Sequence, residues 1–185
     1  SWYAVDNKND DALDTNLSKL EVVKAYWPNH KIETHIMSNN PLDLIDENII
    51  INSDIIYVHY EIKNLDKVVK KILDKNKIPG LVLHSIHKYE NLEKIIGNFQ
   101  AILILSIEKP GVSGQKFNTE SYNLIERINL LKKRNKLNIC VDGGVKSNLI
   151  NKFTSEKVVS GSDVLNSEHP VKKIMKLQTV ARYEK

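Results

Sequence analysis

The amino-acid sequence predicts an α/β fold of the (β/α)8 TIM barrel class, as a single domain over residues 1–185 with its first βα unit missing. Short apolar runs alternate with amphipathic helical patterns along the chain, and no long structureless segment separates them. Because a closed barrel has eight strands and the chain offers seven runs, we expect the missing unit before Trp2. The alternation alone leaves a doubly wound open sheet as the alternative.

Each expected strand is apolar nearly throughout and rich in β-branched residues, which is typical of parallel strands covered on both faces. In chain order these runs are residues 2–5, 31–37, 54–60, 80–84, 101–107, 138–143 and 157–161. The segments between them show the i, i+3, i+4 apolar spacing of an amphipathic helix, most clearly in "DKVVKKIL" and "YNLIERINLLKK". The expected helices are residues 17–27, 41–47, 64–75, 89–97, 119–135, 147–153 and 168–178.

Composition narrows the class of protein. With 41% hydrophobic and 27% charged residues the chain is typical of a soluble globular protein, and no apolar run approaches the ~20 residues of a membrane span. There is no signal-peptide pattern, and the single cysteine, Cys140, cannot form an intramolecular disulfide, which favours the cytosol. The net charge of +4 indicates a solvated lysine-rich face that suits a small anionic substrate, with no nucleic acid or membrane as partner.

Polar residues and one glycine stand where the apolar runs end. They are Asp6, His59, His84, Asp142 and Gly161, while His35 lies within its run. In a barrel the carboxyl ends of the strands form the active-site face, so we expect these scattered residues to converge there. This pattern indicates an enzyme.

Two successive strand ends carry glycine turns. "VDGGV" (141–145) supplies Gly143 and Gly144, and "VVSGSD" (158–163) supplies Gly161 and Ser162 ahead of a helix. Backbone N–H groups at such positions bind anions, and the loops after the last two barrel strands often hold phosphate. The alternative is two ordinary turns. The segment 108–117, "EKPGVSGQKF", is expected to be a mobile cover over the site or else a plain surface loop.

Carboxylate and imidazole side chains at these strand ends suggest a metal. Asp6, Asp142 and His35 are residue types that suit a divalent cation such as Zn, Fe, Mn or Co. Taken alone, His35 is expected to be a buried core histidine. "HSIH" (84–87) has two histidines three residues apart, but at a strand end this spacing is a weak metal signal.

Several motifs occur in a characteristic order along nearly the whole chain. They are "SWYAVD", "THIMSNNP", "VHYE", "GLVLHSIHKYENL", "PGVSGQKF", "VDGGV" and "SGS". In their order and approximate spacing the chain resembles the ribulose-phosphate 3-epimerase family. The pair "GQKF" and "VDGGV" is fairly specific, and the likeness lacks only the family's first strand and helix.

The resemblance implies a barrel of the ribulose-phosphate-binding type and a cytoplasmic isomerase of the pentose phosphate pathway. Such an enzyme inverts C3 of a phosphorylated ketose, interconverting D-ribulose 5-phosphate and D-xylulose 5-phosphate. Two Asp residues exchange the C3 proton on opposite faces of the substrate, through an enediolate that a divalent metal stabilises.

Carried over by position, the resemblance makes Asp6 and Asp142 the catalytic pair and, together with His35, metal ligands. The positions it implies for binding phosphate and substrate are Gly111, Gly143, Gly144, Gly161, Ser162 and Met37.

The chain departs from the family pattern in its first motif. Ala4 stands where the family has a metal-ligand histidine, so metal binding should be weakened unless another group substitutes. Lys8 stands where the family has a methionine, and its ammonium is a candidate to stabilise an enediolate, against the alternative of an exposed loop lysine. His59 and His84 are further candidate site residues.

Other functions stay open at this point. Ala4, together with the altered fifth and sixth loops of the family pattern, is also consistent with a catalytically impaired member that binds a phosphorylated ligand or a partner. The pattern Asp6-x-Lys8-x-x-Asp11 is similar to the signature of the orotidine-monophosphate decarboxylase and hexulose-phosphate synthase group, although so Lys- and Asp-rich a chain matches it easily by chance. The exact ketose phosphate and the oligomeric state stay open too, with a homo-oligomer among the alternatives.

Overall fold

The computed structural model describes the backbone of residues 2–6, 20–45 and 47–183, and the side chains of residues 20–42, 44–45 and 50–180. The seven strands of this part of the chain join in one sheet in their sequence order, β1-β2-β3-β4-β5-β6-β7. They are β1 (Trp2–Asp6), β2 (Glu33–Met37), β3 (Ile55–His59), β4 (Ile78–His84), β5 (Ala101–Leu105), β6 (Asn138–Asp142) and β7 (Lys157–Val159). The pairs β1–β2, β2–β3, β3–β4 and β6–β7 are parallel.

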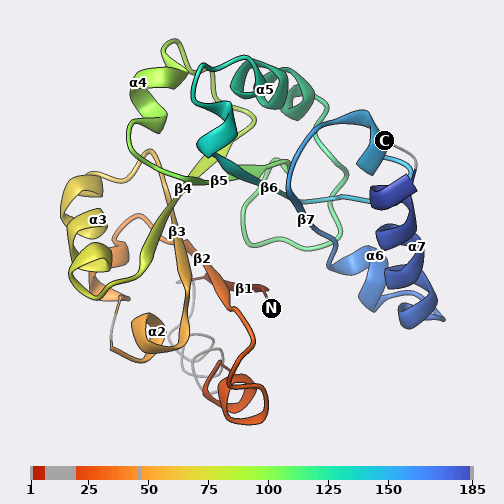
Figure 1. The fold of residues 1–185 in the computed structure, drawn as a ribbon, viewed down its shortest axis with the longest axis horizontal. Helices are drawn as coiled ribbons and strands as arrows, with labels where there is room; N and C mark the ends of the chain where they lie inside the picture. The colour runs from red at the N-terminus through yellow and green to blue at the C-terminus, as the bar shows by residue number, and fades with distance from the viewer. Residues whose placement is uncertain (1, 7–19, 46, 184–185) are drawn as a thin grey trace. The chain divides into compact units, whose positions relative to one another are not determined.

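Helices and short turns follow the strands along the chain (Figure 1). The α-helices are α2 (Glu47–Asn52), α3 (Leu65–Asp74), α4 (Leu92–Ile96), α5 (Glu120–Asn129), α6 (Ser162–Leu165) and α7 (Pro170–Tyr183), and residues 20–26 are helical as well. The 3-10 turns are η1 (Pro41–Asp43), η2 (Arg134–Lys136) and η3 (Ile150–Lys152). Within the described ranges no helix has the length and apolar character needed to cross a membrane.

Every run predicted as a strand overlaps one observed strand, although β1 extends to Asp6 and β4 begins at Ile78, so the parallel α/β sheet is confirmed. The predicted helix 41–47 is wrong, because the chain makes only the 3-10 turn η1 there and α2 begins at Glu47. The carbonyl of Pro41 accepts hydrogen bonds from the N–H groups of both Leu44 and Ile45. These two side chains are buried in the core, which favours the tight turn over a continued helix. The predicted helix 147–153 is likewise reduced to η3.

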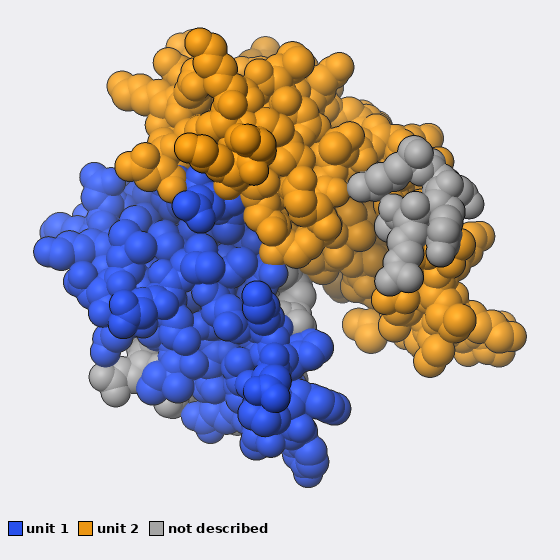
Figure 2. Space-filling model, viewed as in Figure 1, with its two compact units in different colours: residues 1–82, 99–101 blue, residues 83–98, 102–185 orange. Residues whose placement is uncertain are grey.

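The chain divides into two compact units (Figure 2). Unit 1 comprises residues 1–82 and 99–101, and unit 2 comprises residues 83–98 and 102–185. Strands β1, β2 and β3 belong to unit 1, strands β6 and β7 belong to unit 2, and the division falls within β4 and β5.

In unit 1, helices α2 and α3 cover one face of β2 and β3. One apolar cluster joins them: Ile36, Leu44, Ile45, Ile50, Ile56, Val58, Ile62, Val68 and Ile72. Successive side chains of a strand point to opposite faces, and the cluster takes Ile56 and Val58 from β3. The residues that alternate with them, Tyr57 and His59, therefore point to the face away from the helices.

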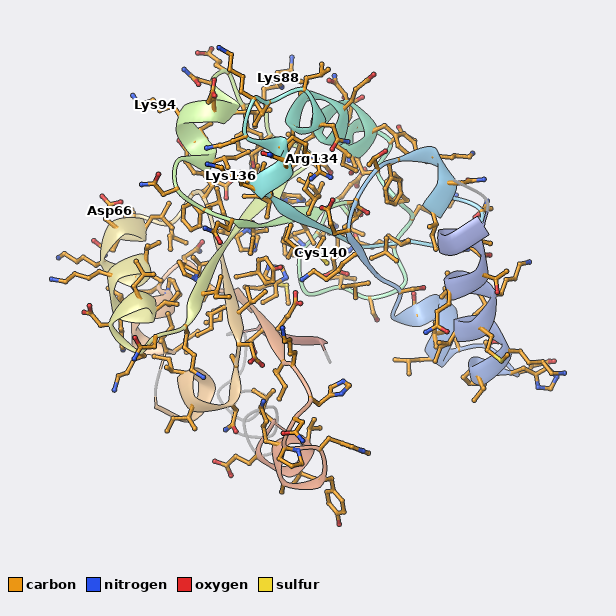
Figure 3. All side chains as sticks on the ribbon, in the orientation of Figure 1. Asp66, Lys88, Lys94, Arg134, Lys136 and Cys140 are labelled. Atoms are coloured by element: carbon orange, nitrogen blue, oxygen red, sulfur yellow. The ribbon has the colours of Figure 1, made fainter. Side chains whose placement is uncertain are left out.

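In unit 2, apolar residues of α5 and of the central strands are buried. Leu124, Ile125 and Ile128 on α5 are almost inaccessible to solvent. Residues 102–105 of β5 and 139–141 of β6 are buried without alternation, as expected of parallel strands covered on both faces. The buried Cys140 is one of these β6 residues (Figure 3).

Glu156 connects the segment before β7 to the start of β6. Its carboxylate accepts hydrogen bonds from the Ile139 N–H and from Arg134 Nη2, each at 2.7 Å. Burial by itself raises the pKa of Glu156, but the hydrogen bonds from Arg134 and Ile139 and the charge of Arg134 outweigh it. The pKa of Glu156 therefore lies below its ordinary value, and folding favours the ionised carboxylate.

The substitution Glu156→Gln is expected to lower the free energy of unfolding at pH 7 by up to about 1 kcal/mol, because a neutral amide binds Arg134 less strongly at this partly exposed position. A carboxylate whose pKa is lowered by folding contributes stability above its unfolded pKa and loses it as the pH falls through the folded pKa. Urea unfolding at pH 7 and at progressively lower pH should show the two proteins converging. A difference in unfolding free energy that does not change with pH would contradict this assignment.

Candidate active site

The strand-end residues of unit 1 lie on three neighbouring parallel strands. The register of β1 and β2 pairs Asp6 with Met37 and Ala4 with His35. Asp6 and Met37 are thus the last residues of their strands, side by side at the same edge of the sheet. The side chain of Asp6 and the whole of Lys8 lie outside the described residues, so the roles predicted for them stay predictions.

His35 and His59 form a pair on the face of the sheet away from α2 and α3. His35 is completely buried, as the sequence predicts. The two Nε2 atoms lie 2.9 Å apart, with the ring centroids 5.0 Å apart and the ring planes inclined by 29°, so the rings meet edge to edge through these nitrogens. Since an imidazole nitrogen either donates or accepts, one proton lies between these two atoms. Beyond the pair, Glu61 Oε2 lies 3.8 Å from His59 Nδ1.

The strand-end carboxyl of unit 2 is Asp142, the last residue of β6. Burial raises its pKa to about 6, and a hydrogen bond from the Gly143 N–H lowers the value only in part. A carboxyl with this pKa exchanges protons near neutral pH, which suits a general acid or base. The sequence singled out this position, but burial, which follows from the fold, is what shifts the pKa.

Ser106 fixes the backbone around Asp142. It follows β5 directly and is fully buried. Its N–H donates to the Asp142 carbonyl at 2.7 Å, and its hydroxyl lies 2.7 Å from the carbonyl oxygens of both Asp142 and Gly143. Sequence reasoning missed Ser106 because the predicted run 101–107 continued through it, whereas β5 ends at Leu105 and leaves Ser106 at the strand end.

His84 ends β4 and is buried in unit 2. Its Nε2 lies 2.6 Å from the Ile107 carbonyl, so this nitrogen carries the proton and donates it. The Tyr89 hydroxyl accepts from the His84 N–H and donates to the His84 carbonyl. These bonds give His84 a definite role in joining two strand ends, and its candidate catalytic role stays a prediction.

The loop after β5 is held by Gln115. Its amide Oε1 accepts from the Lys109 N–H at 3.0 Å, and its Nε2 donates to the carbonyls of Lys109 and Val112 at 2.6 and 2.7 Å. Lys109-Pro110-Gly111-Val112 forms a turn closed by the Val112 N–H, in which Gly111 has φ +78°. Proline followed by a glycine of positive φ is the signature of a type II turn, so the turn itself requires Gly111.

The loop approaches the glycine turn after β6. Gly144 has φ +65°, and a Cβ there would lie 2.8 Å from Lys116 C and 2.9 Å from Gln115 O. A Cβ on Gly143, whose φ is +112°, would lie 2.7 Å from the Ile107 side chain. Both glycines are therefore needed for this backbone to pass so closely. The contact places the "GQKF" segment beside the "VDGGV" turn in the fold.

The two segments predicted to bind phosphate are adjacent within unit 2. The Ser160 hydroxyl, at the end of β7, donates to the Val145 carbonyl at 2.9 Å. Gly161 precedes α6, and a Cβ there would meet no atom of the described residues within 4 Å. Ser162 is the first residue of that helix. The structure thus brings the 143–145 and 160–162 turns together beside open space, while phosphate binding itself stays a prediction.

The side chains that the structure describes include no group of three or more His, Cys, Asp or Glu residues arranged to hold a metal ion. The chemistry of the donors fits a divalent cation in part, because His35 and His59 bring two imidazole nitrogens to within 2.9 Å of each other. Asp6, the predicted carboxylate ligand beside Met37, is described only in its backbone.

Comparison with solved structures shows the class of fold. The structure resembles 3-hexulose-6-phosphate synthase from Salmonella typhimurium with a TM-score of 0.65 and 12% identity, covering 97% of each chain. It also resembles phosphoribosyl anthranilate isomerase from Thermococcus kodakaraensis, with a TM-score of 0.63 and 14% identity over 98% of this chain and 88% of that one. The chain shares the α/β fold of these sugar-phosphate enzymes.

Sequence comparison is more specific. The model of the ribulose-phosphate 3 epimerase family matches residues 5–165. A ribulose-phosphate 3-epimerase from Buchnera aphidicola subsp. Baizongia pistaciae (strain Bp) is 32% identical over 158 residues, which cover 82% of this chain and 67% of that protein. The chain therefore belongs to the ribulose-phosphate 3-epimerase family, as its motifs predicted.

Proposed function

We propose that this protein is an isomerase that inverts C3 of a phosphorylated ketose, interconverting D-ribulose 5-phosphate and D-xylulose 5-phosphate. The observation that carries the proposal is the match to the epimerase family over residues 5–165, and Asp142 supports it as a strand-end carboxyl whose pKa burial raises to about 6. Family membership supplies the reaction class. We further propose that the chain folds as a (β/α)8 barrel domain. The enzyme would be cytoplasmic and act in the pentose phosphate pathway.

The chemistry requires two groups that exchange protons with C3. One carboxylate removes the C3 proton, and a second carboxyl delivers a proton to the opposite face, which inverts the centre. Because the reaction is reversible, each group must serve as base in one direction and as acid in the other. A pKa of about 6 leaves both forms of Asp142 accessible near pH 7, and we assign the second role to Asp6.

The substrate's phosphate is assigned to the glycine turns of unit 2. The Ser160–Val145 hydrogen bond joins the two turns, and Gly143, Gly144, Gly161 and Ser162 are the residues assigned to bind the phosphate. Open space next to Gly161 leaves room for an anion to approach the backbone. Gly111 and Met37 are assigned to the rest of the substrate pocket. The net charge of +4 favours an anionic substrate.

Family members generally use a divalent metal, and His35, Asp6 and Asp142 are the residues of this chain assigned to hold it. When bound, the cation would supply positive charge that stabilises the enediolate oxygens. The chain's own residues must still position the substrate and move the C3 proton. Which cation binds, among Zn, Fe, Mn and Co, depends on ligand geometry and supply.

The direct test is exchange of the C3 hydrogen with solvent. The protein incubated with D-ribulose 5-phosphate in D2O, with and without added Zn²⁺, Mn²⁺, Fe²⁺ or Co²⁺, should incorporate deuterium at C3 and form D-xylulose 5-phosphate. Nuclear magnetic resonance detects both events. Absence of exchange with every metal would contradict the proposal.

A second candidate, a phosphate-ligand binding protein without catalysis, is favoured by one feature. Ala4 is the register partner of His35, at the position where the family has a ligand histidine. Binding of ribulose 5-phosphate without C3 exchange would support this candidate, whereas robust turnover would rule it out.

A further inference from the structure

The loss of a histidine on β1 has a structural counterpart on β3. Strand β2, which carries His35, lies between β1 and β3 in the sheet. On the β1 side its register partner is Ala4, which brings no donor atom. On the β3 side His59 brings its Nε2 to 2.9 Å from His35 Nε2. One neighbouring strand thus offers no imidazole at this register, and the other neighbouring strand places one beside His35.

We propose that His59 is a metal ligand. It binds the divalent cation together with His35, in place of a histidine at the position that Ala4 occupies. The inference rests on the proposed function, because the cation is taken to be the divalent metal that this function assigns to His35. It goes beyond that function because it assigns the ligand role to a residue outside the set carried over from the family.

The distance between the two nitrogens suits a shared cation. Metal–nitrogen bonds of ~2.0–2.1 Å place two adjacent ligands about 2.9 Å apart at a right angle and about 3.3 Å apart in a tetrahedral site. The observed separation of 2.9 Å falls at the lower end of that range. In the metal-free protein one proton lies between these nitrogens, and a cation bound to both takes its place.

The surroundings of His59 also suit a ligand. Its side chain is 14% exposed, so it lies at the border between the buried His35 and solvent, where a cation can enter. Its other nitrogen, Nδ1, faces the Glu61 carboxylate at 3.8 Å. A carboxylate beside the second nitrogen of a ligating histidine orients the ring and increases its basicity.

Direct titration of the chelator-treated protein with Co²⁺ tests the proposal without substrate. The wild-type protein should bind one Co²⁺ per chain, and His59→Gln should weaken the affinity at least about 10-fold. His30→Gln is the matched control, because His30 is an exposed histidine of the same unit and should bind like wild type. Equal affinity of His59→Gln and His30→Gln would overturn the proposal, as would a wild-type protein that binds no Co²⁺.

Two further variants separate a ligand from a residue that only positions His35. In His59→Cys the Co²⁺ complex should gain a thiolate-to-cobalt charge-transfer band in the near ultraviolet, which requires direct coordination. Ala4→His added to His59→Gln should restore the affinity, because it returns the family's donor on β1. Absence of the band in a folded His59→Cys protein that still binds Co²⁺ would overturn the proposal.

These readouts are independent of catalysis. Co²⁺ binding through His59 in a protein that shows no C3 exchange contradicts the proposed function alone. C3 exchange that persists with unchanged metal affinity in His59→Gln contradicts the metal proposal alone.

Discussion

Asp142→Asn is expected to lose about 10²- to 10⁴-fold in C3 proton exchange, the usual contribution of a general acid or base. The same substitution should stabilise the fold at pH 8. Burial raises the pKa of Asp142 from 3.8 to about 6, so the folded protein above pH 6 holds an ionised carboxylate in a site that disfavours it. That difference in pKa corresponds to ~3 kcal/mol as an upper value, and the neutral amide avoids the cost.

The sign of the pH dependence follows from linkage. A group whose pKa is raised by folding adds stability below its unfolded pKa and loses that contribution as the pH rises through the folded pKa. For Asp142 the window lies between pH 3.8 and about 6. The two proteins should therefore have similar stability near pH 4, and the variant should become progressively more stable up to about pH 6. Above that pH the difference should stay constant.

Urea unfolding of metal-free protein between pH 4 and 8 measures this effect. The matched control is Asp66→Asn, an exposed aspartate in the first turn of α3 (Figure 3), for which we expect a change within about 1 kcal/mol at every pH. Since the asparagine introduced by Asp142→Asn would precede Gly143, mass spectrometry must show that its amide has not hydrolysed. A variant that is no more stable than wild type at pH 8 would contradict the buried-carboxyl assignment.

The sequence was sufficient to locate the sheet but not all the helices. Buried parallel strands are runs of β-branched residues with little alternation, and this pattern is local. Each strand therefore overlaps a predicted run, although β1 and β4 extend beyond theirs to Asp6 and Ile78. Segment 41–47 has an apolar content comparable to that of the correctly predicted helices. Its residues Leu44 and Ile45, however, are buried through tertiary contacts after a tight turn at Pro41. A periodicity argument cannot distinguish these two uses of the same residue types.

The candidate site was predictable to a similar degree. The rule that polar residues end apolar strands selected Asp142 and His59, whose surroundings the structure then describes. It could not predict that His35 and His59, 24 residues apart, form a hydrogen bond, because this depends on the register of β2 and β3. The rule did not select Ser106, because the apolar run was predicted to continue to residue 107 and only the structure shows that β5 ends at Leu105.

The glycines of unit 2 provide the largest expected effect on stability. Gly144→Ala should lower the free energy of unfolding by on the order of 3 kcal/mol or more, because two costs combine. The position has φ +65°, which disfavours a side chain, and the added Cβ would overlap the backbone of residues 115–117, which cannot move aside as a flexible side chain could. The loop held by Gln115 would have to detach from the turn that follows Asp142.

Two other glycines separate these costs. Gly114 has φ +78°, but no atom of the described residues lies near its Cβ position. Gly114→Ala therefore carries only the backbone strain, about 1 kcal/mol after allowing for the lower conformational entropy of the unfolded chain. Gly161 has a negative φ and no atom of the described part of the chain near its Cβ position, so Gly161→Ala should change stability by less than about 1 kcal/mol. Chemical unfolding of the three variants at pH 7 should rank the losses as Gly144, then Gly114, then Gly161.

The same variants test whether stability and substrate binding are separate properties of these turns. Gly161→Ala should leave the fold intact but weaken the apparent affinity for a phosphorylated ketose, because the methyl group fills the space beside the proposed anion-binding backbone. Gly114→Ala should have the opposite balance, with lower stability and little change in affinity. If Gly161→Ala changes neither stability nor affinity, the phosphate must bind elsewhere, and the turn after β7 serves the fold alone.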